Sequence, residues 1–298
     1  MDLHTLTQFL VVARLEHLSR AAEELRVAQP SLSRTITRLE RELGTPLFDR
    51  AGRLRLNDAG RLFRGYVERS LGELDAGRRA VAEAVGEGFG AVRLASETFL
   101  AFTGPLTAFK RAHPAVEIRL HQASVEEMAR RLRAREVDLC VASQPLPVGD
   151  VESVRLLDEK VLLGVPLDHP LAGRASVRVE ELAGLPFVAA GQGHWQRRLL
   201  DRLFAASGLI PRVVCEGDEP TAIAELIAAG LGIGLVPAIA RRTAPDTPIA
   251  WLAVDDPACR RTVTLLWNAD DRLPPAARLM RDVLTTWDWP ATHPHPQR

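Results

Sequence analysis

The sequence contains few cysteines and few lysines, and it lacks an apolar run long enough to cross a bilayer. Cys140, Cys215 and Cys259 lie far apart in the chain, which excludes a disulfide-stapled fold and indicates a reducing compartment. The longest apolar run, residues 226–240, is interrupted by three glycines and a proline and falls short of the roughly 20 residues that a membrane span requires. Asp2 stands where an export signal carries basic residues. These absences predict a cytoplasmic protein with no membrane partner.

The overall composition is that of a globular protein. Hydrophobic residues make up 46% of the 298 positions and charged residues 26%, which excludes disordered and collagen-like chains. At roughly 100 to 200 residues per domain, the length predicts two or three compact units.

Positive charge is concentrated near the N-terminus, although the formal net charge of the chain is zero. Residues 26–64 contain nine arginines against four acidic residues, a local excess of five positive charges. Only two of the 38 basic residues are lysines, so we attribute the arginine content to genome composition and base the interpretation on position. Such a stretch is either a solvated surface or a nucleic-acid contact, and the local pattern decides between them.

Three short helices are predicted within the first 44 residues. A capping box formed by Thr5 and Gln8 begins the first helix, and Ser19 is placed to cap the second. Pro30 suits the first turn of the third helix, because an amide there has no partner within the helix. Gly44 is expected to end this helix in the left-handed conformation.

The third helix has an apolar face and a polar, basic face. Its apolar residues recur every three or four positions and form one buried stripe, namely Leu32, Ile36, Leu39 and Leu43. The opposite face, with the turn before it, carries no acid, and we predict that it contacts DNA through Gln29, Ser31, Ser33, Arg34 and Arg38. Arginine matches the paired acceptors of guanine in the major groove, glutamine can bind adenine at two points, and serine reaches phosphates.

The second and third helices form a predicted helix-turn-helix, and a small hairpin follows it as a wing. The hairpin spans residues 48–56 and presents Arg50, Arg53 and Arg55 at its tip, where they can reach the DNA backbone or the minor groove. The alternative is a helical bundle with a polar outer face. The joint occurrence of the basic face, the hairpin and a long helix after them favours DNA binding.

The residues that carry this pattern resemble LysR-type transcriptional regulators. The resemblance rests on the run SRAAEELRVAQPSLSR at residues 19–34, on Pro46-Leu47-Phe48 and on Ala59-Gly60, at that family's spacing. Asn57 departs from the threonine that the family more often has, but asparagine also caps helices well. The resemblance implies a transcription regulator rather than an enzyme. It also implies a homo-oligomer, a dimer or a tetramer, that binds an interrupted palindrome in double-stranded DNA, and it leaves RNA polymerase open as a further partner.

A long linker helix and a hinge are predicted over residues 59–88. Apolar residues recur there at heptad-like intervals, namely Phe63, Val67, Leu71, Leu74, Val81 and Val85. This seam predicts pairing with a second copy of the helix, the alternative being packing within the same chain. Three glycines within the helix would make it marginal alone. Gly86, Gly88 and Gly90 then predict a hinge.

From residue 91 the sequence alternates between strand and helix patterns, which predicts α/β lobes with parallel sheets. Lobe one is expected over residues 91–161 with 268–290, lobe two over 162–267, and crossing strands at 160–167 and 262–267. The fold class is therefore α+α/β, with a winged helix-turn-helix at 1–58, the linker at 59–88 and a two-lobed domain at 91–298. The resemblance implies that this last domain is similar to periplasmic solute-binding proteins and holds a small-molecule effector between its lobes.

Ligands of open α/β sheets bind at the carboxyl ends of strands, close to helix N-termini. The effector-binding residues that this rule predicts are Ser96, Thr98, Gln144, Gly191, His194 and Thr221. Ser96, Thr98 and Thr221 also suit helix caps, so their role stays open. The sequence does not specify the effector's identity.

No catalytic set, metal site or cofactor site is predicted. The glycines at 230, 232 and 234 lie after a helix and inside a strand, whereas a dinucleotide loop follows a strand and opens a helix. No zinc-protease helix or nucleophile elbow occurs. Two further hypotheses are a solute-binding module dimerised by its N-terminal helices and an α/β enzyme. The missing export signal disfavours the first, and the missing nucleophile–base pair disfavours the second.

Overall fold

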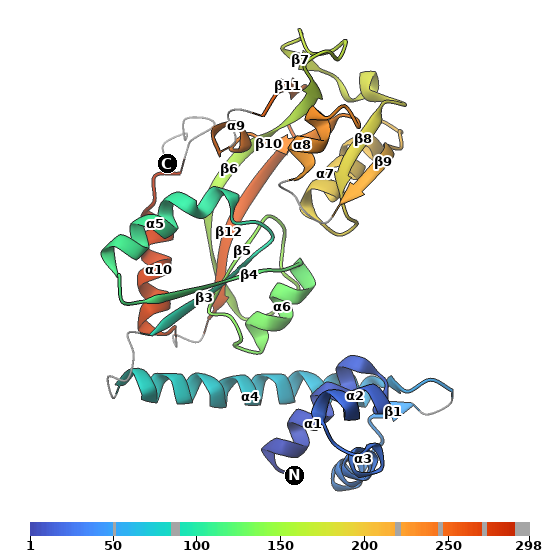
Figure 1. Ribbon diagram of the computed structural model, residues 1–298, viewed down its shortest axis with the longest axis vertical. Coiled ribbons are helices and arrows are strands. Elements are labelled where there is room, and N and C mark those ends of the chain that lie inside the picture. Colours follow the sequence, from blue (N-terminus) through green and yellow to red (C-terminus); the bar gives the residue numbers. More distant parts are fainter. Residues whose placement is uncertain (50–51, 85–89, 218–221, 244–246, 270–272, 290–298) are drawn as a thin grey trace. The chain divides into compact units, whose positions relative to one another are not determined.

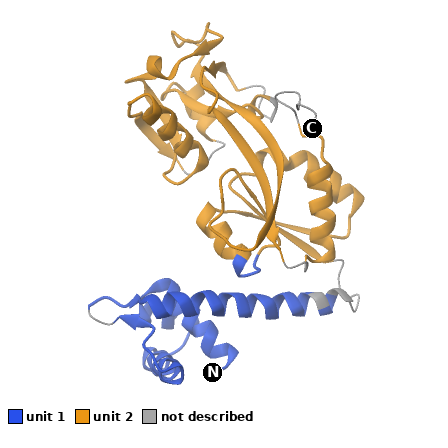
Figure 2. Ribbon diagram, turned by 180° about the vertical axis from the view of Figure 1, so that it is seen from behind, with its two compact units in different colours: residues 1–87, 133–136 blue, residues 88–132, 137–298 orange. Residues whose placement is uncertain are grey.

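The computed structural model describes residues 1–49, 52–84, 90–217, 222–243, 247–269 and 273–289 (Figure 1). Contacts divide the chain into two compact units, residues 1–87 with 133–136 and residues 88–132 with 137–298 (Figure 2). Five residues named in the predictions lie outside the described residues: Arg50, Val85, Gly86, Gly88 and Thr221.

The first unit contains the predicted helices and hairpin. Its elements are α1 (Leu3–Leu15), α2 (Leu18–Leu25), α3 (Gln29–Leu43), β1 (Phe48–Asp49), β2 (Arg55–Leu56) and α4 (Asp58–Ala84). Strands β1 and β2 pair antiparallel, with Phe48 opposite Leu56. Gly44 ends α3 with a φ of 71°, in the left-handed region, as its position predicts.

Two predicted helix caps are wrong. The Asp2 carboxylate caps α1 by accepting the Thr5 amide at 2.7 Å, so Thr5 and Gln8 lie inside the helix and are buried. The ring of His17, and not Ser19, accepts a first-turn amide of α2. The free amides of a first turn can be satisfied by any acceptor placed just before it, and here those acceptors lie two to three residues earlier than expected.

The core of the first unit is built around Phe9. The Phe9 side chain is fully buried, and its ring centroid lies 5.8 Å from that of Phe48 and 5.2 Å from that of Phe63. The predicted stripe of α3 packs into the same cluster through Leu32, Ile36 and Leu39. Burial of this stripe turns the opposite face of α3 away from the core.

Helix α4 belongs to this core over its first half only. Phe63, Val67 and Leu71 pack against the cluster around Phe9, whereas Leu74 and Val81 are 47% and 63% exposed. The first half of the predicted intermolecular seam is therefore used within the chain. Heptad spacing alone does not show whether an apolar seam packs against a second copy of the helix or against the helices of its own chain.

The second unit begins with the first lobe. Its elements are β3 (Ala91–Ser96), the 3-10 turn η1 (Leu100–Phe102), α5 (Thr103–Ala112), β4 (Glu117–Gln122), α6 (Val125–Arg133), β5 (Leu139–Ala142) and, from the far end of the chain, β12 (Arg260–Asn268) and α10 (Pro275–Thr286). Strand β3 lies between β4 and β5 and is parallel to both, as the alternating pattern predicts.

The second lobe follows. Its elements are β6 (Val151–Pro166), β7 (Ser176–Val177), the 3-10 turn η2 (Val179–Leu182), β8 (Pro186–Ala190), α7 (Trp195–Ala206), β9 (Arg212–Gly217), α8 (Ala222–Ala228), β10 (Gly234–Pro237), α9 (Ala240–Thr243) and β11 (Ile249–Val254). Strands β8 and β9 form a separate parallel pair.

One sheet runs through both lobes (Figure 1). Within the described residues its order is β4-β3-β5-β12-β6-β11-β7, with β10 also paired to β6. Both crossing strands are present, but β6 starts at Val151, well before residue 160. The parallel order predicted for the alternating units holds for β3, β4 and β5 and for the pair β8 and β9, whereas the crossing strand β6 is antiparallel to β10, β11 and β12. In the part of the chain that is described, no helix has both the length and the apolar character to cross a membrane.

Candidate functional site

The outward face of α3 presents the predicted DNA contacts to solvent. Gln29, Ser31 and Arg34 are exposed, and Ser33 is half-buried. The residue before the helix, Ala28, provides no side-chain cap, but its carbonyl accepts the Ser31 amide at 2.9 Å. Pro30 has no amide, so in the first turn of α3 the Gln29 amide is the group placed to meet an acceptor such as a phosphate. This face combines hydrogen-bond donors, a guanidinium group and a helix N-terminus.

Arg38 lies on the same face but is partly engaged. Its Nη2 donates to the Thr5 hydroxyl of α1 at 3.4 Å, beside the Asp2 carboxylate that caps that helix. This contact links the middle of α3 to the start of α1. Arg38 therefore has a structural role in addition to its predicted contact with DNA.

Two glutamates, Glu40 and Glu16, hold the hairpin, a role that the sequence analysis did not predict for either. The Oε1 atom of Glu40 on α3 accepts the Leu47 amide at 2.9 Å. Glu16, just after α1, accepts the Leu56 amide through Oε1 at 3.0 Å. Both strands of the wing are thus tied to the helices, and Arg53 is exposed near its tip.

Two cavities lie between the lobes of the second unit. We call the first the apolar cavity; its volume is about 510 Å³, and its lining includes Thr98, Leu100, Trp195, Ile223, Val236 and Arg261. We call the second the polar cavity; its volume is about 530 Å³, and its lining includes Glu97, Gln122, Ser124, Glu126, Gly191 and His194. Both lobes contribute to each cavity.

The predicted effector-binding residues are divided between these cavities. Thr98 lines the apolar cavity, and Gly191 and His194 line the polar cavity. Ser96 is 2% exposed and donates its hydroxyl to the carbonyl of Thr98 at 2.8 Å, so it shapes the loop after β3 from behind. Gln144 lies between the lobes in a polar bridge.

Glu97 is the centre of this bridge, which sequence reasoning did not single out. The buried carboxylate accepts the Ser143 amide at 3.1 Å and Gln144 Nε2 at 2.9 Å, and the Trp195 amide at the start of α7 donates to it as well. Gln144 Nε2 also donates to the carbonyl of Gly193 at 2.9 Å. Burial raises the pKa of Glu97, and these hydrogen bonds act in the opposite direction. The bridge joins lobe one to lobe two.

A buried ion pair lies beside the bridge. Glu159 is 0% and Arg261 4% exposed, and Arg261 Nε donates to Glu159 Oε1 at 2.9 Å. The Ile239 amide donates to the other carboxylate oxygen at 2.8 Å. The guanidinium carbon lies 4.6 Å from the ring centroid of Trp195. A glutamate and an arginine at the ends of apolar crossing strands are the signal that could have identified this pair.

His194 caps α7 in a neutral state. Its Nδ1 accepts the Gln196 amide at 3.3 Å. Burial, assisted by the charge of Arg261, lowers the pKa of His194 to about 4. At neutral pH the ring is therefore uncharged and brings no positive charge to the polar cavity.

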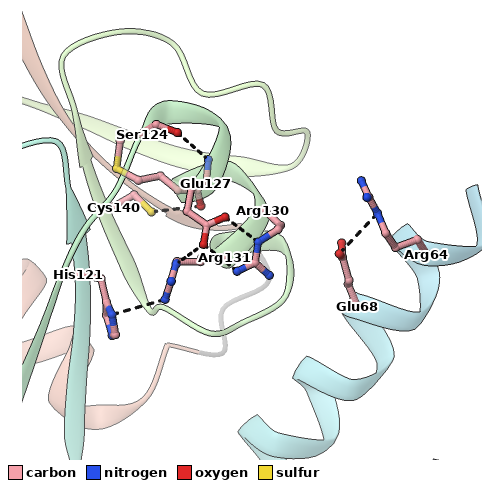
Figure 3. Close-up of polar contacts among 9 residues, drawn as sticks. Arg64, Glu68, His121, Ser124, Glu127, Arg130, Arg131 and Cys140 are labelled. Carbon is pink, nitrogen blue, oxygen red and sulfur yellow. Dashed lines mark hydrogen bonds and ion pairs between the residues drawn. The ribbon is translucent and has the colours of Figure 1, made fainter. Parts of the chain in front are cut away.

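Helix α6, which begins beside the polar cavity, carries a compact set of charges (Figure 3). Glu127 binds Arg130 through two hydrogen bonds of 2.8 and 2.9 Å and Arg131 through one of 2.7 Å. The Arg130 contact, followed by that of Arg131, lowers the pKa of Glu127 to about 2. Ser124 caps the helix by accepting the Glu127 amide at 3.3 Å. The charge of Glu127 is thus compensated on its own helix.

Comparison with known proteins matches both halves of the chain. Residues 3–61 match the bacterial regulatory helix-turn-helix protein, lysR family, and residues 86–288 match the LysR substrate binding domain. The chain is 32% identical over 285 residues to the uncharacterized HTH-type transcriptional regulator YybE of Bacillus subtilis (strain 168), covering 94% of this chain and 97% of that protein. It is also 32% identical over 284 residues to the transcriptional dual regulator GltC of the same organism, covering 93% and 94%.

The fold also resembles that of a solved complex. Full-length CbnR with its target DNA has a TM-score of 0.64 to this chain at 22% identity, covering 95% of this chain and 99% of that one. Among the described residues, no group of three or more His, Cys, Asp or Glu side chains could hold a metal ion. The matches account for the helix-turn-helix around α3 and for the two-lobed unit that contains the cavities. The chain therefore belongs to the LysR family of transcriptional regulators, with an N-terminal DNA-binding domain and a C-terminal effector-binding domain.

Proposed function

We propose that the protein binds an interrupted palindromic operator through paired helix-turn-helix heads and that a small molecule between the lobes changes the geometry of those heads. The observation that supports this most directly is the two-sided character of α3. Leu32, Ile36 and Leu39 are buried, while Gln29 and Arg34 on the other side are exposed. Since its partner is chromosomal DNA, the proposal places the protein in the cytoplasm.

The exposed arginines have different roles in this proposal. Arg34 lies one turn into α3, where a recognition helix meets base edges in the major groove, and it reads one guanine. Arg53 near the hairpin tip contacts the phosphate backbone or the minor groove, which provides affinity with little sequence information. Arg38 reaches the same DNA surface while its Nη2 stays bonded to Thr5.

Pairing of the heads is assigned to α4. Four large apolar side chains are exposed along it, Leu62 at 66%, Tyr66 at 57%, Leu74 at 47% and Val81 at 63%. Their spacings of four, eight and seven residues keep them on one side of the helix. A second copy of α4 would cover this stripe, which gives a dimer, and further contacts between such dimers would give a tetramer.

Effector control follows from the difference in affinity between two arrangements of the lobes. The bridge from Glu97 and Gln144 to the start of α7 holds one arrangement, and a molecule in the cleft favours whichever arrangement it fits better. A regulator bound beside a promoter also meets RNA polymerase, which we include as a proposed partner of the DNA-bound oligomer.

Binding selection from a random duplex pool, followed by gel-shift titration, tests the DNA assignment. Arg34→Ala should weaken binding by about 1–3 kcal/mol and relax the preference at one base pair. Arg53→Ala should weaken binding to all duplexes and reduce the salt slope by about one. The matched control is Arg155→Ala, an exposed arginine of the second unit, which should bind as the parent does. Parental affinity and sequence preference in both head variants would show that the reading face is wrong.

A further inference from the structure

Three groups in the described part of the cleft that could bind an anion are already engaged by carboxylates of the protein itself. The first amide of α7, from Trp195, and the amide of Ser143 both donate to Glu97. Arg261 uses Nε and Nη2 to bind Glu159. An incoming carboxylate or phosphate would have to compete with these buried acceptors, which are held in place by the fold and need no ordering on binding.

The charge that remains on the described cleft walls is negative. Glu97 and Glu126 line the polar cavity, and Glu225 lines the apolar cavity together with Arg261, whose charge the buried ion pair compensates. Glu126 Oε1 lies 3.8 Å from Arg198 Nη2, which compensates its charge. The negative charge of the described cleft walls therefore comes from Glu97 and Glu225. Glu97 is buried, and like charges repel in a site that is shielded from water, so the described walls of the cleft disfavour an anion.

The apolar cavity suits a compact hydrophobic molecule. Its volume of about 510 Å³ lies within the range of roughly 300–1,000 Å³ that small-molecule sites occupy. Its walls include Leu100, Ala101, Ile223 and Val236. Trp195 lines the same cavity and is 6% exposed, and its Nε1 has no hydrogen-bond partner among the residues that the structure describes. The indole ring adds to the apolar walls of the cavity.

We propose that the apolar cavity binds an uncharged, largely hydrophobic molecule and that it rejects organic anions. This inference rests on the proposed function and assigns the chemical class of the effector. Ala101 belongs to lobe one and Ala224 to lobe two, and both line the cavity. A bound molecule therefore contacts both lobes and can bias their arrangement.

Displacement of a neutral fluorescent probe from the full chain tests the preference for an uncharged ligand. N-phenyl-1-naphthylamine is the probe, and 1-acetonaphthone and 1-naphthoate are the competitors, which share one ring system and differ in charge. The ketone should displace the probe at a concentration at least about tenfold lower than the acid. Equal or better displacement by the acid overturns the inference.

Cavity-filling variants locate the site. Ala101→Trp and Ala224→Trp fill the apolar cavity from opposite lobes, and each should weaken probe binding at least about tenfold. The matched control Ala123→Trp narrows the polar cavity and should leave probe binding unchanged. If either filling variant folds, as judged by circular dichroism, and keeps the parental affinity, the site assignment is wrong.

Gel-shift titration of the same samples keeps the two proposals apart. A parent protein that binds its selected duplex but prefers the acid refutes only the effector class. A parent protein that prefers the ketone but binds no duplex refutes the proposed function and leaves the cavity assignment standing.

Discussion

Gly60, near the start of α4, lies where the backbone before the wing comes close to the long helix. A Cβ at this position would overlap the carbonyl oxygen of Leu47 and lie 2.5 Å from Leu56 Cδ2. The same carbonyl accepts the Asn57 amide at 3.1 Å, so it cannot move away without losing that bond. Gly60→Ala therefore forces the wing to shift. By contrast, a Cβ at Gly65, one and a half turns further along α4, meets nothing within 4 Å.

The two substitutions should change stability in opposite directions. Overpacking costs about 1–3 kcal/mol, and a lost hydrogen bond adds about 1 kcal/mol. The higher helix propensity of alanine returns up to about 1 kcal/mol. We expect Gly60→Ala to lower the free energy of unfolding of the first unit by about 1–3 kcal/mol. Gly65→Ala, which has only the propensity gain, should raise it by up to about 1 kcal/mol.

Urea unfolding of the full chain measures both effects, with hydrogen exchange of peptides from residues 45–65 as the local readout. All five tryptophans lie in the second unit, so their fluorescence transition should stay at the parental midpoint in both variants. The reasoning fails if Gly60→Ala is as protected from exchange as the parent, or if Gly65→Ala is destabilised as much as Gly60→Ala.

Three further predictions concern titration and reactivity in the second unit. His194 has a folded-state pKa of about 4, below its usual 6.5, so the free energy of unfolding decreases as pH falls from 6.5 to 4. The variant His194→Asn keeps a capping oxygen but does not titrate. In pH-dependent urea unfolding it should lose less free energy of unfolding over that window than the parent does. Ionised Glu127, with its pKa lowered from 4.5 to about 2, contributes stability that is present above pH 4.5 and lost towards pH 2. Glu127→Gln should reduce the change in the free energy of unfolding between pH 4.5 and 2 and leave the change between pH 6.5 and 4.5 as in the parent. An unchanged pH dependence below 4.5 would contradict the role of the Arg130 and Arg131 contacts. Burial raises the pKa of Cys140 and Cys259 to about 12, whereas Cys215 is half-buried. Mass spectrometry of maleimide-treated native protein should therefore find one rapidly labelled cysteine per chain, Cys215. Rapid labelling at Cys140 would count against the packing described.

The first unit could be predicted well because its signals are local. The stripe of Leu32, Ile36 and Leu39 follows helix periodicity, and Gly44 marks the end of α3 through its own backbone preference. The wrong caps at Thr5 and Ser19 come from the same kind of signal, because several polar residues close together can satisfy a first turn. Local patterns also left the partner of α4 undecided.

The cleft was predicted in outline and not in its chemistry. Glu97 meets Ser143 and Trp195, and Glu159 meets Arg261 across 102 positions of sequence. These contacts depend on the order of strands in the sheet, which no local pattern encodes. The early start of β6 was missed for a related reason. Residues 152–155 are polar or exposed, so they lack the apolar run by which a buried strand is recognised.

The long ladder between β6 and β12 constrains how the lobes can move. The two strands stay paired along the whole of β12, from Arg260 to Asn268. A hinge motion that moved the lobes directly apart would break backbone hydrogen bonds between β6 and β12. The register shifts once, between Val263 and Thr264, next to the stretch where β12 also pairs with β5. Irregularities of this kind concentrate bending and twist. We therefore expect a bound molecule to rotate one lobe relative to the other about the strand pair β6 and β12, at the register shift between Val263 and Thr264.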